Sequence, residues 1–412
     1  MERIVITGMG TVNPLGLNVA ETWKNVTNGV SGVAPIAQFD ASNLQVQIAC
    51  ELKGFEPDKF MDAKESRRRD RFEQMATAAA NEALRNSGLE ITDSNTARTG
   101  VIISSAIGGL KSFQDAVITD VTEGPRRVSP FLIPMLMSNG GAGIVAIDHG
   151  IKGPCFSVAS ACASGADGIG MAFMMLRAGM IDACLAGASE STVAHIGVAA
   201  FDRIGAMSRH NEDYSMTPQP FDRNRDGLVM GEGAAVLALE SESHAKARGA
   251  NILAELAGYG STADAYHVTA PQEFGEGGAA AIRQALYSAQ ANADDVGYIS
   301  AHGTGTQLND QSETRAVKAA FGADLAHKIP ISSTKSMTGH MMGATGALEV
   351  IFCVQAVREG LLPPTIHYET PDPECDLDYI PNKAREKKVT MAISNAFGFG
   401  GHNAVLAVRK YQ

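Results

Sequence analysis

The chain contains a weak internal repeat, and this feature limits its possible folds more than any other. Residues 162–168 read Cys-Ala-Ser-Gly-Ala-Asp-Gly, and residues 340–346 read His-Met-Met-Gly-Ala-Thr-Gly. Each segment begins a predicted helix of similar length. The helices end at residues 177–179 and 358–360, each with an arginine and then a glycine, a common pattern at helix C-termini. The sequence therefore predicts two similar halves.

Other stretches match in the same order along the chain. These pairs are 100–108 with 297–303 and 233–239 with 403–408. We place the N-terminal half, with Cys162, at residues 1–249 and the C-terminal half, with His302 and His340, at residues 250–412. Chance similarity between segments rich in glycine and alanine is the alternative interpretation.

Short runs of β-branched residues alternate with helical segments rich in alanine and glycine, which predicts an α/β fold with helices covering sheets. The predicted strands are 3–7, 99–104, 182–186 and 234–239. The predicted helices are 64–86, 164–176 and 277–290.

The charge balance argues against nucleic acid as a partner. The net charge is −11 and the pI is near 5.4, whereas binding to phosphates requires a basic face. One local exception is a basic run that comprises Lys64, Arg67, Arg68, Arg69 and Arg71. It is either a solvated helix face or a docking site for an acidic partner.

The six cysteines form no CxxC pair, and the N-terminus has no long apolar signal core. No apolar stretch is long enough to cross a membrane, since the most apolar helix meets Arg177 early. We therefore expect a cytoplasmic protein with reduced thiols and no membrane association.

Two familiar binding motifs are incomplete. Gly8-Met-Gly10 follows a strand but lacks the third glycine of a dinucleotide-binding loop. Residues 222–233 imitate a calcium loop, but the twelfth position is Gly233 and two arginines oppose a cation. We expect neither a metal nor a cofactor.

Cys162 and His340 occupy equivalent positions if a pseudo-twofold axis relates the two halves, and both then face the interface between the halves. Cys162 has small neighbours and comes at the start of a helix, where free N–H groups and the helix dipole stabilise a thiolate. This pattern fits a nucleophile, although a buried structural cysteine is the usual case for a free thiol.

Further chemistry-bearing residues lie on glycine-rich segments of the C-terminal half. His302 opens the loop Gly-Thr-Gly-Thr, and Lys335 precedes His340 by five residues. Glu349 offers a carboxylate that can keep Lys335 charged in a dry site. Near the C-terminus, residues 395–403 combine three glycines with two phenylalanines, so we expect a loop that closes over an apolar ligand, not a central strand.

These residues carry a resemblance that runs along essentially the whole chain. The chain resembles the β-ketoacyl-[acyl-carrier-protein] synthases of the elongating type II kind, in the thiolase-like superfamily. The matching segments are 7–16, 157–165, 220–227, 231–233, 301–306, 333–340 and 395–403. The resemblance implies a duplicated five-layer α/β/α/β/α sandwich and a homodimer.

The resemblance also implies a reaction. An acyl chain is carried on Cys162, and His302 and His340 stabilise the enolate formed when malonyl-[acyl-carrier-protein] loses CO2, in fatty acid elongation. Lys335 sets the local field, and backbone N–H groups of Cys162 and Phe399 bind the oxyanion. The alternatives are a condensing subunit of a polyketide-type pathway, a non-catalytic chain-length factor, which would lack the cysteine, and a thiolase, which needs a second cysteine where this chain has His402.

Other roles follow from the same resemblance. Thr304, Thr306 and Thr269 match residues that hold the pantetheine arm of the acyl carrier protein. Ile107 and Phe201 match residues of the acyl pocket, Phe399 matches a gating residue, and Phe397 is its neighbour. Lys64, Arg67 and Arg68 match the carrier-docking patch. Gly205 is a departure, because relatives often have a cation there; Arg203 or Arg209 is a candidate replacement.

Overall fold

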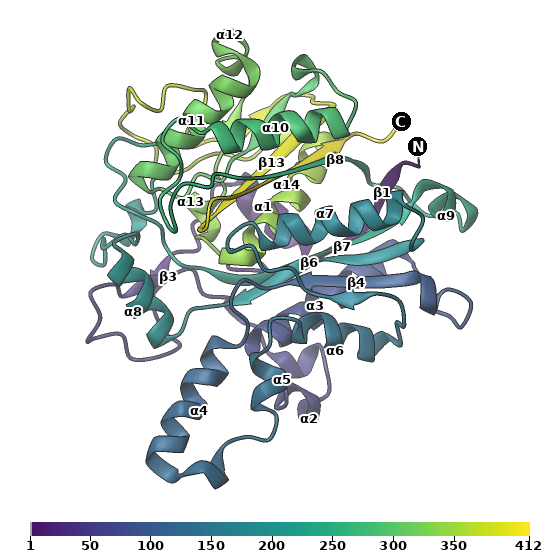
Figure 1. Cartoon of the computed structure of the whole chain (residues 1–412). Coiled ribbons are helices and arrows are strands. Elements are labelled where there is room, and N and C mark those ends of the chain that lie inside the picture. Colours follow the sequence, from purple (N-terminus) through teal and green to yellow (C-terminus); the bar gives the residue numbers. More distant parts are fainter. Residues whose placement is uncertain (1) are drawn as a thin grey trace.

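The fold consists of two five-stranded halves joined edge to edge (Figure 1). The structure is a computed structural model that describes residues 2–412. In the N-terminal half the strand order is β5-β4-β6-β7-β1, and in the C-terminal half it is β10-β9-β13-β14-β8. The halves meet where Ile4–Ile6 of β1 pair with Ala254–Leu256 of β8 in antiparallel fashion. The same order in both halves confirms the predicted duplication.

The strands of the N-terminal half are β1 (Ile4–Val12), β4 (Thr99–Ser104), β5 (Cys155–Phe156), β6 (Ala183–Ser191) and β7 (Glu232–Ser241). Those of the C-terminal half are β8 (Ala254–Ala263), β9 (Tyr298–Ser300), β10 (Ile331–Ser332), β13 (Met391–Gly398) and β14 (His402–Arg409). Two small sheets pair β2 (Ala34–Pro35) with β3 (Ile48–Ala49) and β11 (Leu361–Leu362) with β12 (Arg385–Glu386).

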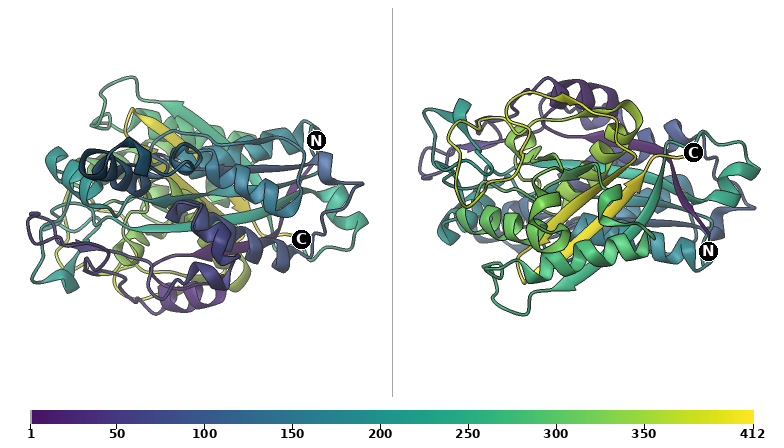
Figure 2. Two further views of the ribbon diagram at one scale, coloured as in Figure 1. Left: turned by 90° about the horizontal axis from the view of Figure 1, so that it is seen from below. Right: turned by 90° about the horizontal axis from the view of Figure 1, so that it is seen from above.

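Helices form three layers around the two halves of the sheet, which gives the predicted five-layer sandwich. The outer layer of the N-terminal half is formed by α3 (Arg71–Ser87) and α6 (Gly140–His149). The opposite outer layer is formed by α10 (Glu276–Ser288) and α11 (Gln307–Phe321), as the two views of Figure 2 show from opposite sides. The middle layer contains α7 (Ser164–Arg177) and α14 (Thr345–Glu359), which contact strands of both halves.

The remaining helices are α1 (Val19–Thr27), α2 (Ala63–Ser66), α4 (Leu110–Glu123), α5 (Leu132–Leu136), α8 (His195–Ile204), α9 (Glu242–Ala247), α12 (Ala323–Ala326) and α13 (Lys335–Thr338). Within residues 2–412, no helix combines the length and apolar character needed to cross a membrane.

Small residues let the two middle helices approach each other at their N-terminal ends. A Cβ at Gly165 would lie 2.6 Å from the carbonyl oxygen of Gly343, and one at Gly346 would touch the side chain of Ala166. The first distance leaves no room for a side chain at residue 165, and the second is already a full van der Waals contact. The close crossing brings the segment before α7 next to the segment before α14.

The predicted helix over residues 64–86 is wrong near its N-terminal end. The structure has α2, then a break at residues 67–70, then α3. Asp70 caps α3, because its side chain accepts from the N–H of Phe72 while the carboxylate of Glu73 accepts from the N–H of Asp70. This capping box starts a new helix where residue composition alone suggests a continuous one.

The first strand is longer than predicted. β1 continues through Gly8 and Gly10 to Val12, whereas the predicted strand ended at residue 7. A Cβ at Gly8 would lie 2.2 Å from the carbonyl oxygen of Ala83, and one at Gly10 would lie 2.1 Å from that of Ala79. These glycines therefore allow α3 to pack closely on the strand.

Candidate active site

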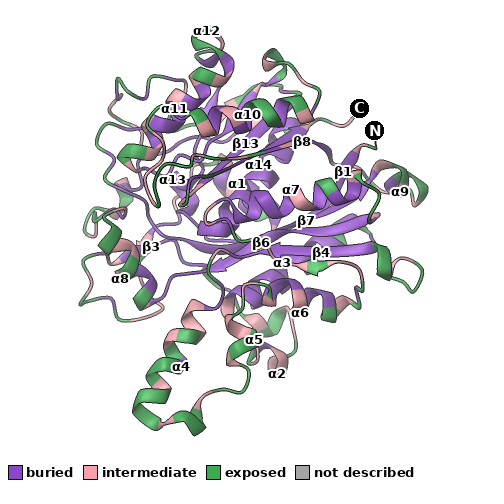
Figure 3. Cartoon of the chain, viewed as in Figure 1, coloured by how far each residue is buried: buried purple, intermediate pink, exposed green. Residues whose placement is uncertain are grey.

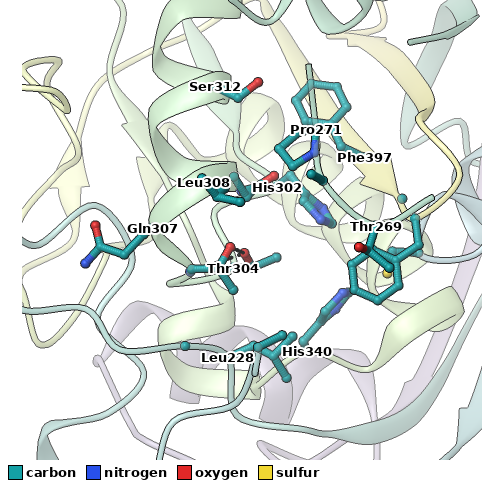
Figure 4. A pocket seen from close by; sticks show the side chains of 18 of the residues that line it. Leu228, Thr269, Pro271, His302, Thr304, Gln307, Leu308, Ser312, His340 and Phe397 are labelled. Carbon is teal, nitrogen blue, oxygen red and sulfur yellow. Dashed lines mark hydrogen bonds between the residues drawn. The ribbon is translucent and has the colours of Figure 1, made fainter. Parts of the chain in front are cut away.

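A single pocket of about 290 Å³ collects the residues that the sequence singled out from the two halves (Figure 4). Cys162 comes from the N-terminal half, and His302 and His340 come from the C-terminal half. The predicted ligand-contacting residues that line it are Thr269, Thr304, Thr306, Phe201, Phe397 and Phe399. The structure thus brings together a thiol, two imidazoles, hydroxyls and aromatic rings.

Cys162 lies between a sharp turn and the first residue of α7. Ala161 adopts a φ of 52°, in the left-handed region, and α7 begins at Ser164. Removal of the sulfur from water raises the pKa of the Cys162 thiol to about 11, although Lys335 and the backbone N–H groups of Phe399 and Cys162 lower it. The N–H groups thus stabilise the thiolate as expected, but desolvation outweighs them and favours the thiol in the resting site.

The two histidines face each other. The centroids of the His302 and His340 rings are 5.4 Å apart, with the ring planes at 85°. Both side chains are buried, and this burial, reinforced by the positive charge of Lys335, lowers the pKa of each imidazole well below its ordinary value. Both rings are therefore neutral at physiological pH, and each has one N–H to donate.

His340 presents an unsatisfied nitrogen. Its Nδ1 lies 3.1 Å from Oγ1 of Thr345, whereas its buried Nε2 has no hydrogen-bond partner. The backbone of His340 is fixed, since its N–H donates to Val229 and its carbonyl accepts from Gly231. His340 was expected at the helix N-terminus itself, but α14 begins five residues later, at Thr345.

A buried carboxylate that sequence reasoning missed holds the loop that carries His302. Glu313 accepts hydrogen bonds from the N–H of His302 at 2.8 Å and from the N–H of Gly303 at 2.7 Å. The amide of Asn395 donates to the same carboxylate at 3.0 Å. Glu313 lies on the solvent-shielded side of α11, and only the helical period of that segment could have suggested its inward direction.

Lys335 and Glu349 form the predicted ion pair. Nζ of Lys335 lies 2.6 Å from Oε1 of Glu349, and each side chain is only 1% exposed. Burial raises the pKa of Glu349 to about 7, while the ammonium of Lys335 acts to lower it. Lys335 does not line the pocket, so it acts on the site through its charge. Within residues 2–412 no cluster of three or more His, Cys, Asp or Glu side chains suits a metal ion.

The C-terminal aromatic segment is a hairpin, which corrects the expectation of a loop over residues 395–403. Asn395–Gly398 belong to β13 and pair with β14, and only residues 399–401 form the turn. Phe399 at this turn stacks on Phe201, with the ring centroids 6.4 Å apart. A Cβ at Gly398 would lie 3.0 Å from the backbone nitrogen of Cys162, so glycine lets the hairpin touch the turn that carries Cys162.

Two hydroxyls lie together in the part of the pocket lined by α11. Oγ1 of Thr304 and Oγ1 of Thr306 are 2.9 Å apart, on the loop between His302 and α11. Thr269 lines the same pocket from the loop after β8 (Figure 4). These hydroxyls offer donors and acceptors to a polar ligand that enters beside the apolar rings.

Ile107 does not line this pocket. Its side chain is 37% exposed, and its backbone is held by Glu190, which also accepts from the N–H groups of Ala106 and Gly343. Glu190 is fully buried, and sequence reasoning missed it. Its hydrogen bonds join the loop of Ile107 to the loop that follows His340.

The members of the basic run differ in how far they are exposed. Lys64 and Arg67 are exposed. Arg69 is buried and forms two hydrogen bonds of 2.7 Å to Asp148, and Arg71 pairs with the buried Glu232. Arg68 is half-buried, pairs with Glu65 and lies over the ring of Phe131. Only Lys64, Arg67 and Arg68 therefore remain available to a partner.

Near Gly205, which ends α8 and lines the pocket, the two candidate cations differ. Both side chains are exposed, and only Arg209 has a described ion pair, to Asp202, with Nη2 3.0 Å from Oδ1.

The duplicated fold and a pocket with one cysteine and two histidines define the class of thiolase-like acyltransferases. The chain belongs to the beta-ketoacyl synthase family: residues 1–245 match the model of the N-terminal domain, and residues 253–369 match that of the C-terminal domain.

Individual relatives cover the whole chain. The "3-oxoacyl-[acyl-carrier-protein] synthase 2" of Staphylococcus aureus is 47% identical over 411 residues, which are 100% of this chain and 99% of the relative. The protein of the same name from Synechocystis sp. is 44% identical over 411 residues, with the same coverage. A beta-ketoacyl synthase structure from Burkholderia phymatum has a TM-score of 0.92 at 35% identity and covers 100% of both chains. The ketosynthase complex AntDE:AntF has a TM-score of 0.91 at 34% identity, with the same coverage.

Proposed function

We propose that this chain condenses an acyl group on Cys162 with malonyl-[acyl-carrier-protein] and forms 3-oxoacyl-[acyl-carrier-protein] in fatty acid elongation. Family membership and the names of relatives with 47% and 44% identity support the reaction. The observation that carries the residue roles is the convergence of Cys162 with two buried, neutral imidazoles in one pocket.

Acyl transfer comes first. The sulfur of Cys162 attacks the thioester carbonyl of the acyl carrier, and the carbon–sulfur bond to pantetheine breaks. The proton of the Cys162 thiol passes to the departing pantetheine sulfur, so the exchange is balanced. The N–H groups of Cys162 and Phe399, which both contact the sulfur region, bind the oxyanion of the tetrahedral intermediate.

Decarboxylation and condensation follow. The bond between the malonyl carboxylate and its methylene carbon breaks, CO2 leaves, and the electron pair forms an enolate. N–H donors of His302 and His340 stabilise the enolate oxygen. The methylene carbon then attacks the Cys162 thioester, the carbon–sulfur bond breaks, and the sulfur leaves as a thiolate that regains a proton. Burial, reinforced by the charge of Lys335, keeps the imidazoles neutral.

An acyl carrier protein is the proposed partner, and Lys64, Arg67 and Arg68 are its proposed docking residues. Lys64 and Arg67 are exposed and Arg68 is half-buried, in contrast to the buried Arg69, which supports this role. The similar AntDE:AntF structure is of a ketosynthase in complex with its acyl-carrier protein. The pantetheine arm would contact the hydroxyls of Thr269, Thr304 and Thr306.

A homodimer is proposed because one face of the molecule exposes many apolar side chains. The arm, residues 110–137, projects from the body and is largely exposed (Figures 1 and 3). Its exposed apolar residues are Phe113, Val117, Ile118, Val121, Phe131, Ile133 and Met137. Such a patch is unusual on a monomer.

A cytoplasmic location is also proposed, and the six free cysteines support it.

We propose that Ile107 forms one wall of the acyl tunnel. The second copy of the chain in the homodimer would complete this tunnel by covering the base of the arm. Ile107→Phe should therefore load short acyl primers onto Cys162 and reject long ones. Each excluded methylene forfeits about 0.8 kcal/mol of burial, so discrimination should rise steeply with chain length. Intact-mass analysis over a series of acyl carriers measures this; loading in the wild-type ratio would remove Ile107 from the tunnel.

The proposed reaction is tested with the purified full-length protein, acyl carriers of graded length and malonyl carrier. We expect an acyl adduct on Cys162, release of CO2, and a 3-oxoacyl carrier two carbons longer than the primer. Repeated extension to a polyketone without reduction of the keto group would instead favour the polyketide-type alternative. Absence of any acyl adduct would contradict the proposal.

A further inference from the structure

The duplication relates two polar residues that the proposed mechanism does not use. Asp167 follows Cys162 by five residues, and Thr345 follows His340 by five residues. Asp167 lies in the first turn of α7, and Thr345 is the first residue of α14. These helices are the equivalent middle-layer helices of the two halves, so Asp167 and Thr345 occupy equivalent positions.

Thr345 touches its catalytic neighbour directly. Its Oγ1 lies 3.1 Å from Nδ1 of His340, and it is only 1% exposed. If the hydroxyl donates to Nδ1, the proton of the neutral ring must lie on Nε2. The unpartnered, buried Nε2 of His340 is then a donor, which is the form that an enolate oxygen requires.

Asp167 is connected to the turn before Cys162 through Ser160. The hydroxyl of Ser160 donates to Oδ2 of Asp167, and the hydroxyl of Tyr259 donates to Oδ1 at 2.5 Å. Ser160 begins the turn in which Ala161 has its positive φ and after which Cys162 follows. Ser160 also accepts from the N–H of Ala163 and thereby closes the turn around Cys162.

The contact between Asp167 and Tyr259 crosses between the two halves. Tyr259 lies on β8 of the C-terminal half, and its ring rests directly on Gly170 of α7. A Cβ at Gly170 would lie 2.4 to 2.5 Å from atoms of that ring, so only glycine allows this position. The ring is thereby held where its hydroxyl reaches Asp167. Tyr259 of the C-terminal half thus stabilises, through Asp167 and Ser160, the turn that precedes Cys162.

We propose that Asp167 and Thr345 are equivalent positioning residues, one for each half-reaction. Asp167, with Ser160 and Tyr259, holds the turn that aims the sulfur of Cys162 for acyl transfer. Thr345 sets the tautomer of His340 for decarboxylation. The inference rests on the proposed function, and it assigns each residue to a different chemical step.

The two half-reactions are measured separately. Acyl transfer is followed as the rate of adduct formation on Cys162 by intact mass, and decarboxylation as CO2 release from malonyl carrier. Asp167→Ala and Tyr259→Phe should slow acyl transfer by about 10- to 100-fold, the scale of a misplaced reacting group, and change decarboxylation by less than about threefold. Asp167→Asn, which can still bond both hydroxyls, should retain most of the acyl-transfer rate.

Thr345→Val should give the opposite pattern. It should slow decarboxylation by about 10²-fold, as loss of an oxyanion donor does, and leave acyl transfer within about threefold. Thr345→Ser keeps the hydroxyl and should restore decarboxylation. Nitrogen NMR of labelled histidine should place the His340 proton on Nε2 in the wild type and not in Thr345→Val.

Matched controls remove buried hydroxyls elsewhere. Tyr298→Phe loses a hydrogen bond to Ser332, and Thr314→Val loses bonds to Asp310 and Tyr379. Both should change the two half-reactions equally, whatever their effect on stability. The inference is overturned if Asp167→Ala or Tyr259→Phe lowers both rates equally, or if Thr345→Val leaves decarboxylation intact. If Asp167→Ala does not fold, Tyr259→Phe decides. Failure of the wild type to form the Cys162 adduct would contradict the proposed function instead.

Discussion

The two halves share one strand order but place different chemistry at the equivalent position. The N-terminal half places a thiol after a turn with a positive φ at Ala161, where hydrogen-bond donors converge. The C-terminal half places His340 among buried charges, beside Lys335 and Glu349. Burial keeps both groups uncharged, because it raises the pKa of the thiol and lowers that of the imidazole. In the proposed mechanism, one scaffold thus supplies a nucleophile from one half and neutral donors from the other.

The largest effect is expected at the nucleophile. Cys162→Ala should abolish the acyl adduct and the condensation while the fold stays intact, because the mutation removes only the reacting sulfur. Intact mass and peptide mapping measure the adduct, and circular dichroism controls for folding. Full acylation of the variant, mapped to Cys155 or Cys184, would transfer the nucleophile role elsewhere and break the comparison between the halves.

The buried ion pair of the C-terminal half should be the next most sensitive feature. Lys335→Ala leaves the buried carboxyl of Glu349 without its partner, so this group must take up a proton or remain an unpaired charge, which should cost up to about 3–5 kcal/mol of unfolding free energy. Urea unfolding measures this change. The matched double variant Lys335→Met with Glu349→Leu removes both charges and should recover much of the loss. A cost below about 1 kcal/mol for Lys335→Ala would mean that water reaches the pair.

The smallest effect is expected at the exposed cations of the N-terminal half. Reversal of charge at Arg67 and Arg68 to glutamate should raise KM for carrier-bound substrates several-fold, with little effect on small pantetheine thioesters. Lys383→Glu with Lys388→Glu changes the net charge equally at another exposed site and serves as the control. Equal changes with both substrate types would favour a simple solvated helix face.

Much of the fold follows from the sequence, because helix-ending signals and repeated segments are local. The positions of β4 and α7 were predicted almost to the residue. The break between α2 and α3 was not predicted. Asp70 and Glu73 form a capping box only when their side chains accept hydrogen bonds from the backbone N–H groups at the start of α3. The extent of β1 depends on α3, which lies about seventy residues away in the chain, so the predicted strand ended before Gly8.

The site was predicted from residue types and could not be completed from them. Cys162, His302 and His340 lie on glycine-rich segments, and such segments indicate places where a substrate can approach a reactive side chain. Glu313 lies on a helix without such a signal, and Thr345 lies in the repeated segment but was not singled out, because the contacts of both follow only from the direction of their side chains. The raised pKa of Cys162 was also missed, because desolvation depends on everything packed around the sulfur.

The central claim is that the two halves divide the reaction, and the histidines test it most directly. The rates of CO2 release and of Cys162 acylation should be measured side by side in His302→Ala and His340→Ala. The account predicts that each variant loses about 10²-fold or more in decarboxylation, as for a lost oxyanion donor, while acylation of Cys162 continues. Unchanged decarboxylation in either variant, or loss of acylation to the same extent, would contradict it.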